Sequence, residues 1–160
     1  MAVPRVPIGM NAIKFSHFTA LGFDFGLKRI GVAVGQTLTQ SANPVAILKA
    51  GKGVPDWEKV KELIETWKVD VLIVGIPYNM DGSEQPLTHA ARKFANKLKL
   101  KSGLPVYTID ERLTTIEAKR FWFEQKFQKN VKLPQQFDSH AAKLILEQWL
   151  QENVGRIDNG

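Results

Sequence analysis

Residues 22–33, GFDFGLKRIGVA, contain the pattern that decides the fold of this chain. Apolar residues alternate with small or polar ones over 20–25 and again over 30–35, and a short glycine-containing segment, 26–29, separates the two runs. A period of two is typical of a β-strand, and two such runs around a short turn predict a β-hairpin.

Outside this hairpin, helical and strand patterns follow one another along the chain. The continuous apolar run at 71–76 is typical of a strand that is buried on both faces. The expected fold is therefore α/β, with a mixed five-stranded sheet in which the antiparallel hairpin joins parallel strands, and with helices on both faces. The other expected elements are strands at 44–48 and 104–109, helices at 56–67, from Pro86 and from Thr114, a loop at 129–137 and a last helix at about 138–150.

The composition indicates one globular domain. With 160 residues, of which 44% are hydrophobic, the chain can form a single core. We expect this domain over 18–152, a poorly ordered N-terminal lead-in at 1–17 and a C-terminal tail at 153–160. The absence of cysteine excludes a disulfide framework, a cysteine zinc site and thiol catalysis. No apolar run approaches the roughly 20 residues of a bilayer-spanning helix, so we expect a cytoplasmic protein without a membrane partner.

The net charge of +6 is confined to one part of the sequence. Residues 84–135 contain 11 Lys or Arg and 5 Asp or Glu, whereas the remaining segments contain 11 of each kind. A localised basic surface favours a polyanionic partner such as a phosphate backbone. The alternative is that these lysines form a solvated helix face that keeps the protein soluble.

Asp24 is an anomaly inside a strongly apolar strand. Aspartate is a poor strand residue, and burying a lone carboxylate is costly. Glycines 22 and 26, and the small residues of the second strand, predict a surface that a ligand or another backbone can approach closely. Functional use of Asp24 competes with a local role, in which turn amides satisfy its carboxylate.

Two further acidic positions stand at the ends of expected core elements. Asp110 and Glu111 follow the strand at 104–109, and sites in open α/β sheets gather beyond the carboxyl ends of strands. Alternation does not choose between the two, and both also suit a polar loop. Asp138 opens the stripe of the last helix that continues through Ala141 and Ala142, although aspartate there also suits an ordinary helix N-cap.

If these carboxylates converge, they form an all-oxygen site of the kind that Mg²⁺ or Mn²⁺ prefers. Two ions about 3.5–4 Å apart clamp the attacking and leaving oxygens of a phosphodiester. Basic residues would hold the polyanion while the acidic residues hold the metal. The three histidines are dispersed, without a second histidine at metal-binding spacing.

Five stretches resemble, in order, the motifs of the YqgF family of pre-16S rRNA nucleases. The resemblance covers about residues 20–150. The matching stretches are GFDFGLKRIGVA at 22–33, VGIP at 74–77, DGS at 81–83, DERLTT at 110–115 and DSHAA at 138–142.

This resemblance implies an RNase H-like fold, related to the bacterial Holliday junction resolvases, and a role in processing the 5′ end of 16S ribosomal RNA. It implies that Asp24, Glu111 and Asp138 are catalytic and bind two Mg²⁺ or Mn²⁺ ions. The related resolvases place their second acid on another strand, whereas here the strand at 71–76 ends without a carboxylate. The residues expected to bind substrate are Lys28, Arg29 and Arg112.

Three hypotheses for the partner and the activity remain at this point. The first is a nuclease acting on pre-16S rRNA or on a ribosomal precursor particle. The second is a resolvase acting on branched DNA, for which a symmetric junction favours a dimer over a monomer. The third is an RNA-binding ribosome-assembly factor without catalysis. The expected oligomeric state is a monomer or a weak homodimer.

Overall fold

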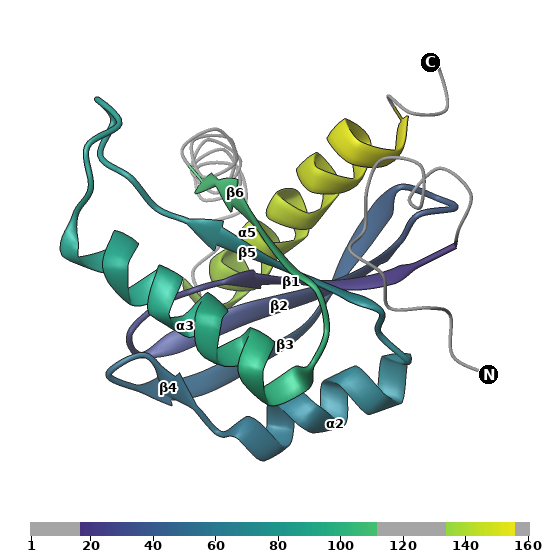
Figure 1. Cartoon of the computed structure of the whole chain (residues 1–160), viewed down its shortest axis with the longest axis horizontal. Helices are drawn as coiled ribbons and strands as arrows, with labels where there is room; N and C mark the ends of the chain where they lie inside the picture. The colour runs from purple at the N-terminus through teal and green to yellow at the C-terminus, as the bar shows by residue number, and fades with distance from the viewer. Residues whose placement is uncertain (1–16, 112–133, 156–160) are drawn as a thin grey trace.

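The computed structural model describes residues 17–111 and 134–155, which form one mixed β-sheet covered by helices on both faces (Figure 1). The sheet has six strands in the order β4-β3-β2-β1-β5-β6. The strands are β1 (Thr19–Asp24), β2 (Arg29–Gln36), β3 (Ser41–Gly51), β4 (Val54–Pro55), β5 (Val71–Ile76) and β6 (Val106–Asp110).

The five expected strands are present, and the sixth corrects the expected number. β4 has two residues and pairs with the end of β3 through Gly51 and Val54. A segment this short shows no alternation from which a sequence pattern could be recognised. β3 is also longer than the expected strand at 44–48, because its pairing with β2 continues past a bulge.

The hairpin at the centre of the sheet has the expected pairing. β1 pairs antiparallel with β2, and on its other side it pairs parallel with β5, which pairs parallel with β6. The carboxyl ends of β1, β5 and β6 therefore lie at one edge of the sheet.

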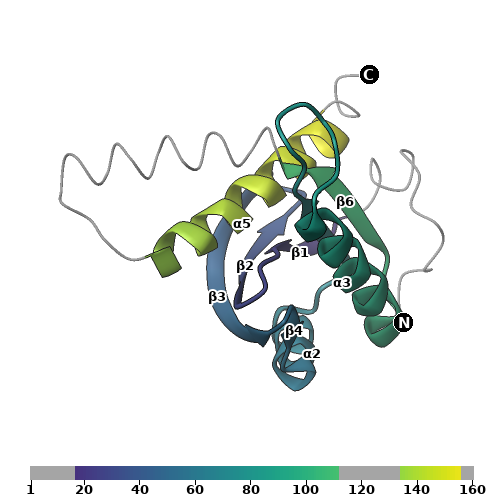
Figure 2. The same cartoon turned by 90° about the vertical axis from the view of Figure 1, so that its left-hand side faces the viewer.

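Helices cover the two faces of the sheet unequally (Figure 2). On one face, α2 (Trp57–Trp67) and α3 (Pro86–Ser102) pack on large apolar side chains that include Leu21, Phe23 and Val74. The Phe94 ring of α3 anchors this face through three other aromatic rings. Its centroid lies 5.7 Å from that of Phe23, 5.2 Å from that of Phe25 and 5.7 Å from that of Trp57.

On the other face, α5 (Pro134–Leu150) lies close to the sheet and is followed by a helical turn, Gln151–Gly155. The strands present small residues here, such as Ala20, Ala33 and the glycines, to Ala142, Leu146 and their neighbours on the helix. Small side chains on both elements permit this close approach.

The helix starts confirm two expectations and correct a third. Asp56 caps α2 by accepting a hydrogen bond from the backbone N–H of Glu58 at 3.0 Å, and Pro86 opens α3. In contrast, α5 begins at Pro134, not at Asp138. Proline is well suited to the first helical position, where no N–H is required, so residues 134–137 open α5 and do not belong to the expected loop at 129–137. Asp138 is therefore inside the helix and is not its N-cap.

The helix expected from Thr114 lies outside the described residues. No helix among the described segments is both long and apolar enough to cross a membrane.

Gly22→Ala is expected to destabilise the protein by about 1–3 kcal/mol, as overpacking of a filled core does. A Cβ atom on Gly22 would lie 2.8 Å from the Cβ of Leu146 and 3.2 Å from the backbone oxygen of Ala142, so α5 would have to move. The matched control is Gly51→Ala, because a Cβ at that position meets no atom within 4 Å. Urea unfolding of both variants measures the difference, and equal stability of the two would contradict the packing of α5 on β1.

Candidate active site

Asp24 is the last residue of β1, at the edge where the parallel strands end. In register, it lies between Gly31 of β2 and Gly75 of β5. Residues in register share a face of the sheet, and the alternation along β1 places Asp24 on the α5 face, with Gly22 and Ala20. The expected small surface beside Asp24 is confirmed, since both of its strand neighbours are glycines. These glycines place no side chain of β2 or β5 next to the carboxylate.

Glu111 approaches the same glycine from the neighbouring strand. It directly follows β6, and only 8% of its surface is exposed. Its Oε2 atom lies 3.3 Å from the position that a Cβ on Gly75 would occupy. Gly75 therefore lies between Asp24 and Glu111 in the sheet, and a Cβ at this position would lie only 2.6 Å from Cδ1 of Ile145, which covers it from α5.

Asp110 belongs to the other side of the sheet. It is in register with Ile76, whose side chain is in the core beneath α2 and α3. It lines a hollow together with Ile76 and Tyr78. Asp110 and Glu111 thus lie on opposite faces of the sheet, and Glu111 is the acid that shares a face with Asp24.

The backbone of α5 runs toward this edge at its N-terminal end. Ala142 and Leu146 lie over Gly22, and farther along the helix Leu146 and Leu150 lie over Gly35, which pairs with Ala20. The helix therefore runs antiparallel to β1. Position 138 precedes Ala142 by four residues, a rise of about 6 Å, and Asp24 follows Gly22 by about 7 Å along the strand. The backbone of residue 138 is thus placed toward Asp24, while its side chain is not among those described.

The structure describes two of the three residues that are expected to bind substrate. Lys28 and Arg29 are exposed on the turn that follows Asp24, and Arg29 begins β2 two residues before Gly31. Arg112 lies outside the described residues.

The loop at 77–85 closes on itself beside the carboxyl ends of β5 and β6. Asp81 accepts hydrogen bonds from the backbone N–H of Ser83 at 2.9 Å and from its hydroxyl at 2.6 Å. Arg92 of α3 forms an ion pair with Glu84 at 2.8 Å and donates to the hydroxyl of Tyr78 at 3.0 Å. The hydrogen bond to Glu84, followed by that to Tyr78, raises the pKa of Arg92 above its ordinary value. This part of the edge is therefore ordered by its own polar contacts.

His140 does not add positive charge near the N-terminal part of α5 at neutral pH. Burial lowers the pKa of its imidazole below the ordinary value of 6.5, and the charge of Lys143 lowers it further, against a smaller opposing effect of Glu147. The folded protein thus binds this proton less readily than the unfolded chain does. The contribution of His140 to the free energy of unfolding is therefore fully present above about pH 6.5, and it is lost as the pH falls through the pKa of the folded state.

Among the side chains of residues 17–111 and 140–153, no group of three or more His, Cys, Asp or Glu is placed to hold a metal ion. Asp24 and Glu111 supply two carboxylates on the face of the sheet that α5 covers, on either side of Gly75. This donor chemistry fits a hard divalent cation, which prefers oxygen ligands.

Comparisons with known proteins agree with the fold. A family model described as "RuvX: Holliday junction resolvase" matches residues 18–152. A protein of Coxiella burnetii named "Putative pre-16S rRNA nuclease" is 73% identical over 136 residues, which cover 85% of this chain and 94% of that protein. A protein of Shewanella oneidensis with the same name is 50% identical over 137 residues, covering 86% of this chain and 96% of that protein.

Among solved structures, RuvC of T. thermophilus in complex with a Holliday junction substrate superposes with a TM-score of 0.51 at 15% identity. The superposition covers 84% of this chain and 94% of that one. At this level of identity the likeness concerns the fold alone, which is the RNase H-like fold of RuvC.

Proposed function

The chain belongs to the RuvX family of Holliday junction resolvases, enzymes that hydrolyse ester bonds, and we propose that it is a metal-dependent nuclease whose substrate is pre-16S rRNA. In this proposal the catalytic residues are Asp24, Glu111 and Asp138, and they also bind the metal. The reaction is the hydrolysis of a phosphodiester near the 5′ end of the 16S rRNA precursor, in the cytoplasm.

One observation carries this proposal. Asp24 ends β1, Glu111 follows β6 and lies 87 positions later in the sequence, and both flank Gly75 on the face of the sheet that α5 covers. Bringing two carboxylates together at the edge of a core is unfavourable unless a cation or a proton compensates their charges. Gly31 and Gly75 place no side chain of β2 or β5 beside Asp24, and Ile145 of α5 covers Gly75 itself.

Asp24 and Glu111 would hold one or two Mg²⁺ or Mn²⁺ ions, with Asp138 as the third acidic ligand. When bound, such ions lower the pKa of a water molecule and neutralise charge on a phosphoryl group. The protein contributes the rigid placement of the carboxylates: β1 holds Asp24 through ladders on both of its sides, and the core buries most of Glu111. Lys28 and Arg29, with Arg112, bind the phosphate and orient the scissile bond in front of these acids.

The choice of RNA rests on the names of the curated relatives. A basic surface binds the backbone of RNA and of DNA alike. A branched DNA junction is therefore the second candidate substrate, favoured by the description of the matching family.

A cleavage assay tests the proposal and chooses between these substrates. The purified protein is given an RNA that spans the 5′ end of the 16S precursor, or a four-way DNA junction, with Mg²⁺, with Mn²⁺ or with a chelator. We expect cleavage of the RNA that requires the divalent ion. Cleavage of the junction alone would assign the enzyme to DNA, and binding of RNA without cleavage in either metal would favour a non-catalytic assembly factor.

A further inference from the structure

The β3–β4 hairpin is hydrogen-bonded to the turn that follows Asp24. The backbone N–H of Ala50 donates to the carbonyl of Lys28 at 2.8 Å, and that of Gly53 donates to the carbonyl of Leu27 at 2.8 Å. These contacts bring Gly51-Lys52-Gly53, about 25 residues later in the sequence, to the edge that carries Asp24. In Figure 1 the β1–β2 turn and β4 lie at the same end of the sheet.

The two segments concentrate positive charge at this edge. Arg29 and Lys49 are direct partners in the β2–β3 ladder, so two cations stand opposite one another on the same face. Like charges in this arrangement destabilise a sheet. Lys28 and Lys52 extend the positive charge on both sides, and all four side chains are exposed. Within the described part of the chain, Lys28, Lys49 and Lys52 form no ion pair.

The conformation of the β3–β4 turn adds a second observation. Lys52 has a φ of +52°, in the left-handed region that glycine and asparagine adopt more readily than lysine. Gly53 follows with a φ of +84°, and a Cβ there would lie 2.7 Å from the ring of Phe25. The hairpin is thus packed against the residue next to Asp24, and it carries a lysine where glycine or asparagine would adopt the backbone conformation more easily.

We propose that Lys49 and Lys52, together with Lys28 and Arg29, form a phosphate-binding cluster that holds the nucleic-acid backbone beside the candidate active site. A polyanion compensates the exposed charges of Lys28, Lys49 and Lys52, for which the described part of the chain supplies no ion pair. The ligand chemistry is the phosphodiester backbone, which RNA and DNA share. The inference rests on the proposed function for its substrate class, and it adds two residues from a segment with no predicted role in binding.

The test is the salt dependence of binding, measured in chelator so that no cleavage occurs. Fluorescence anisotropy follows a labelled single-stranded RNA of 20 nucleotides, and a DNA of the same sequence, at several salt concentrations. For single strands each lost phosphate contact reduces the slope of log K against log[salt] by about 0.7, so Lys49→Gln/Lys52→Gln is expected to reduce it by about 1.4. We expect roughly tenfold weaker binding in about 0.1 M salt, equally for RNA and DNA.

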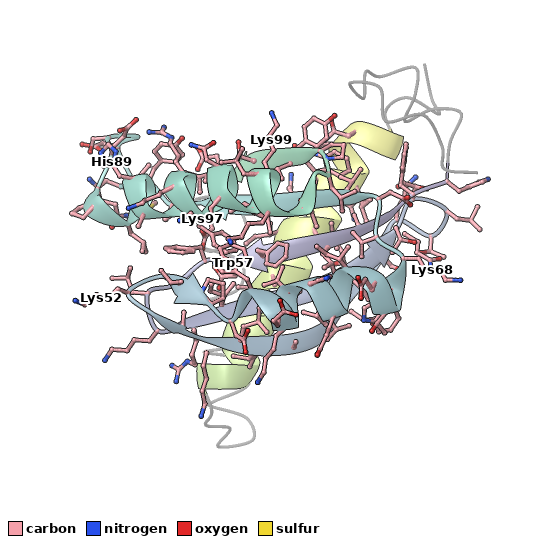
Figure 3. The ribbon with its side chains drawn as sticks, turned by 60° about the horizontal axis from the view of Figure 1, so that its bottom comes forward. Lys52, Trp57, Lys68, His89, Lys97 and Lys99 are labelled. Atoms are coloured by element: carbon pink, nitrogen blue, oxygen red, sulfur yellow. The ribbon has the colours of Figure 1, made fainter. Side chains whose placement is uncertain are left out.

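The matched control is Lys68→Gln/Lys99→Gln, which removes the same charge at the other end of the fold. Lys68 follows the last residue of α2, and Lys99 is in the last turn of α3, whereas Lys52 extends from the hairpin at the opposite end (Figure 3). Its slope is expected to equal that of the unmodified protein. An equal loss in both double variants, an unchanged slope in Lys49→Gln/Lys52→Gln, or no binding by the unmodified protein would each overturn the inference.

Thermal unfolding adds a readout that separates binding from folding. Lys49→Gln removes the repulsion opposite Arg29, so its Tm is expected to equal or exceed that of the unmodified protein while its binding weakens. A variant that bound weakly because it was misfolded would lose both. Normal binding through this cluster without metal-dependent cleavage would reject the proposed nuclease and leave the cluster standing. Metal-dependent cleavage together with an unchanged salt slope in Lys49→Gln/Lys52→Gln would reject the cluster and leave the proposed nuclease standing.

Discussion

Asp24→Asn is expected to lower the rate of metal-dependent cleavage by roughly 10³-fold, which corresponds to about 4 kcal/mol of transition-state stabilisation. Asparagine has nearly the same shape, and the main-chain pairing of β1 with β2 and β5 does not depend on the side chain. The change therefore removes a negative charge at the glycine-lined edge and leaves the scaffold in place. The measurement is a single-turnover cleavage rate at saturating Mn²⁺, with Glu65→Gln, an exposed carboxylate on α2, as the control.

Thermal unfolding with and without Mn²⁺ shows whether the loss arises from metal binding. A ligand that binds only the folded state stabilises it by about 2.7 kcal/mol at 100 times its dissociation constant. The Tm of the unmodified protein is expected to rise on adding Mn²⁺, and that of Asp24→Asn is expected to stay nearly constant. Without metal, the Tm of Asp24→Asn measures how much the substitution changes folding by itself. Full activity in this variant would remove Asp24 from the catalytic assignment.

Glu111→Gln and Asp110→Asn are expected to differ sharply, although the two residues are adjacent. Glu111 flanks Gly75 on the same face as Asp24, so its loss is expected to reduce cleavage on the order of 10²-fold. Asp110 is in register with Ile76 and lines the hollow near Tyr78 on the other side, so its substitution is expected to change the rate little. Cleavage rates of the two variants, measured side by side at saturating metal, make the comparison.

The pair is informative because each variant is the control for the other. Both remove one negative charge from the same turn of the chain, so an effect of net charge alone would weaken both equally. If Asp110→Asn lost the activity and Glu111→Gln kept it, the second acidic residue would have to act from the α3 side of the sheet. That outcome would contradict the convergence on Gly75, on which the proposed function depends.

Local patterns of the sequence were sufficient for most of the fold. The alternation around residues 26–29 predicted the central hairpin, and the unbroken apolar run of β5 predicted a strand buried on both sides. These predictions succeed because the side-chain period of a strand depends on its immediate neighbours and its burial. Two predictions failed for local reasons. A proline can end one helix or open the next, and Pro134 opens α5. The two residues of β4 are too few to show an alternating pattern.

The candidate site was predicted only in part, and tertiary structure accounts for the rest. The sequence alone identified Asp24 as an anomaly, because a charge in an apolar strand conflicts with its surroundings. It left Asp110 and Glu111 open, because the face on which each one lies depends on the register between β5 and β6. It also gave no role to Lys49 and Lys52, since their proximity to Asp24 arises from hydrogen bonds between segments about 25 residues apart. Strand pairing is a long-range property, so the chain's own pattern determined which residues could act, and only the paired sheet decided which of them meet.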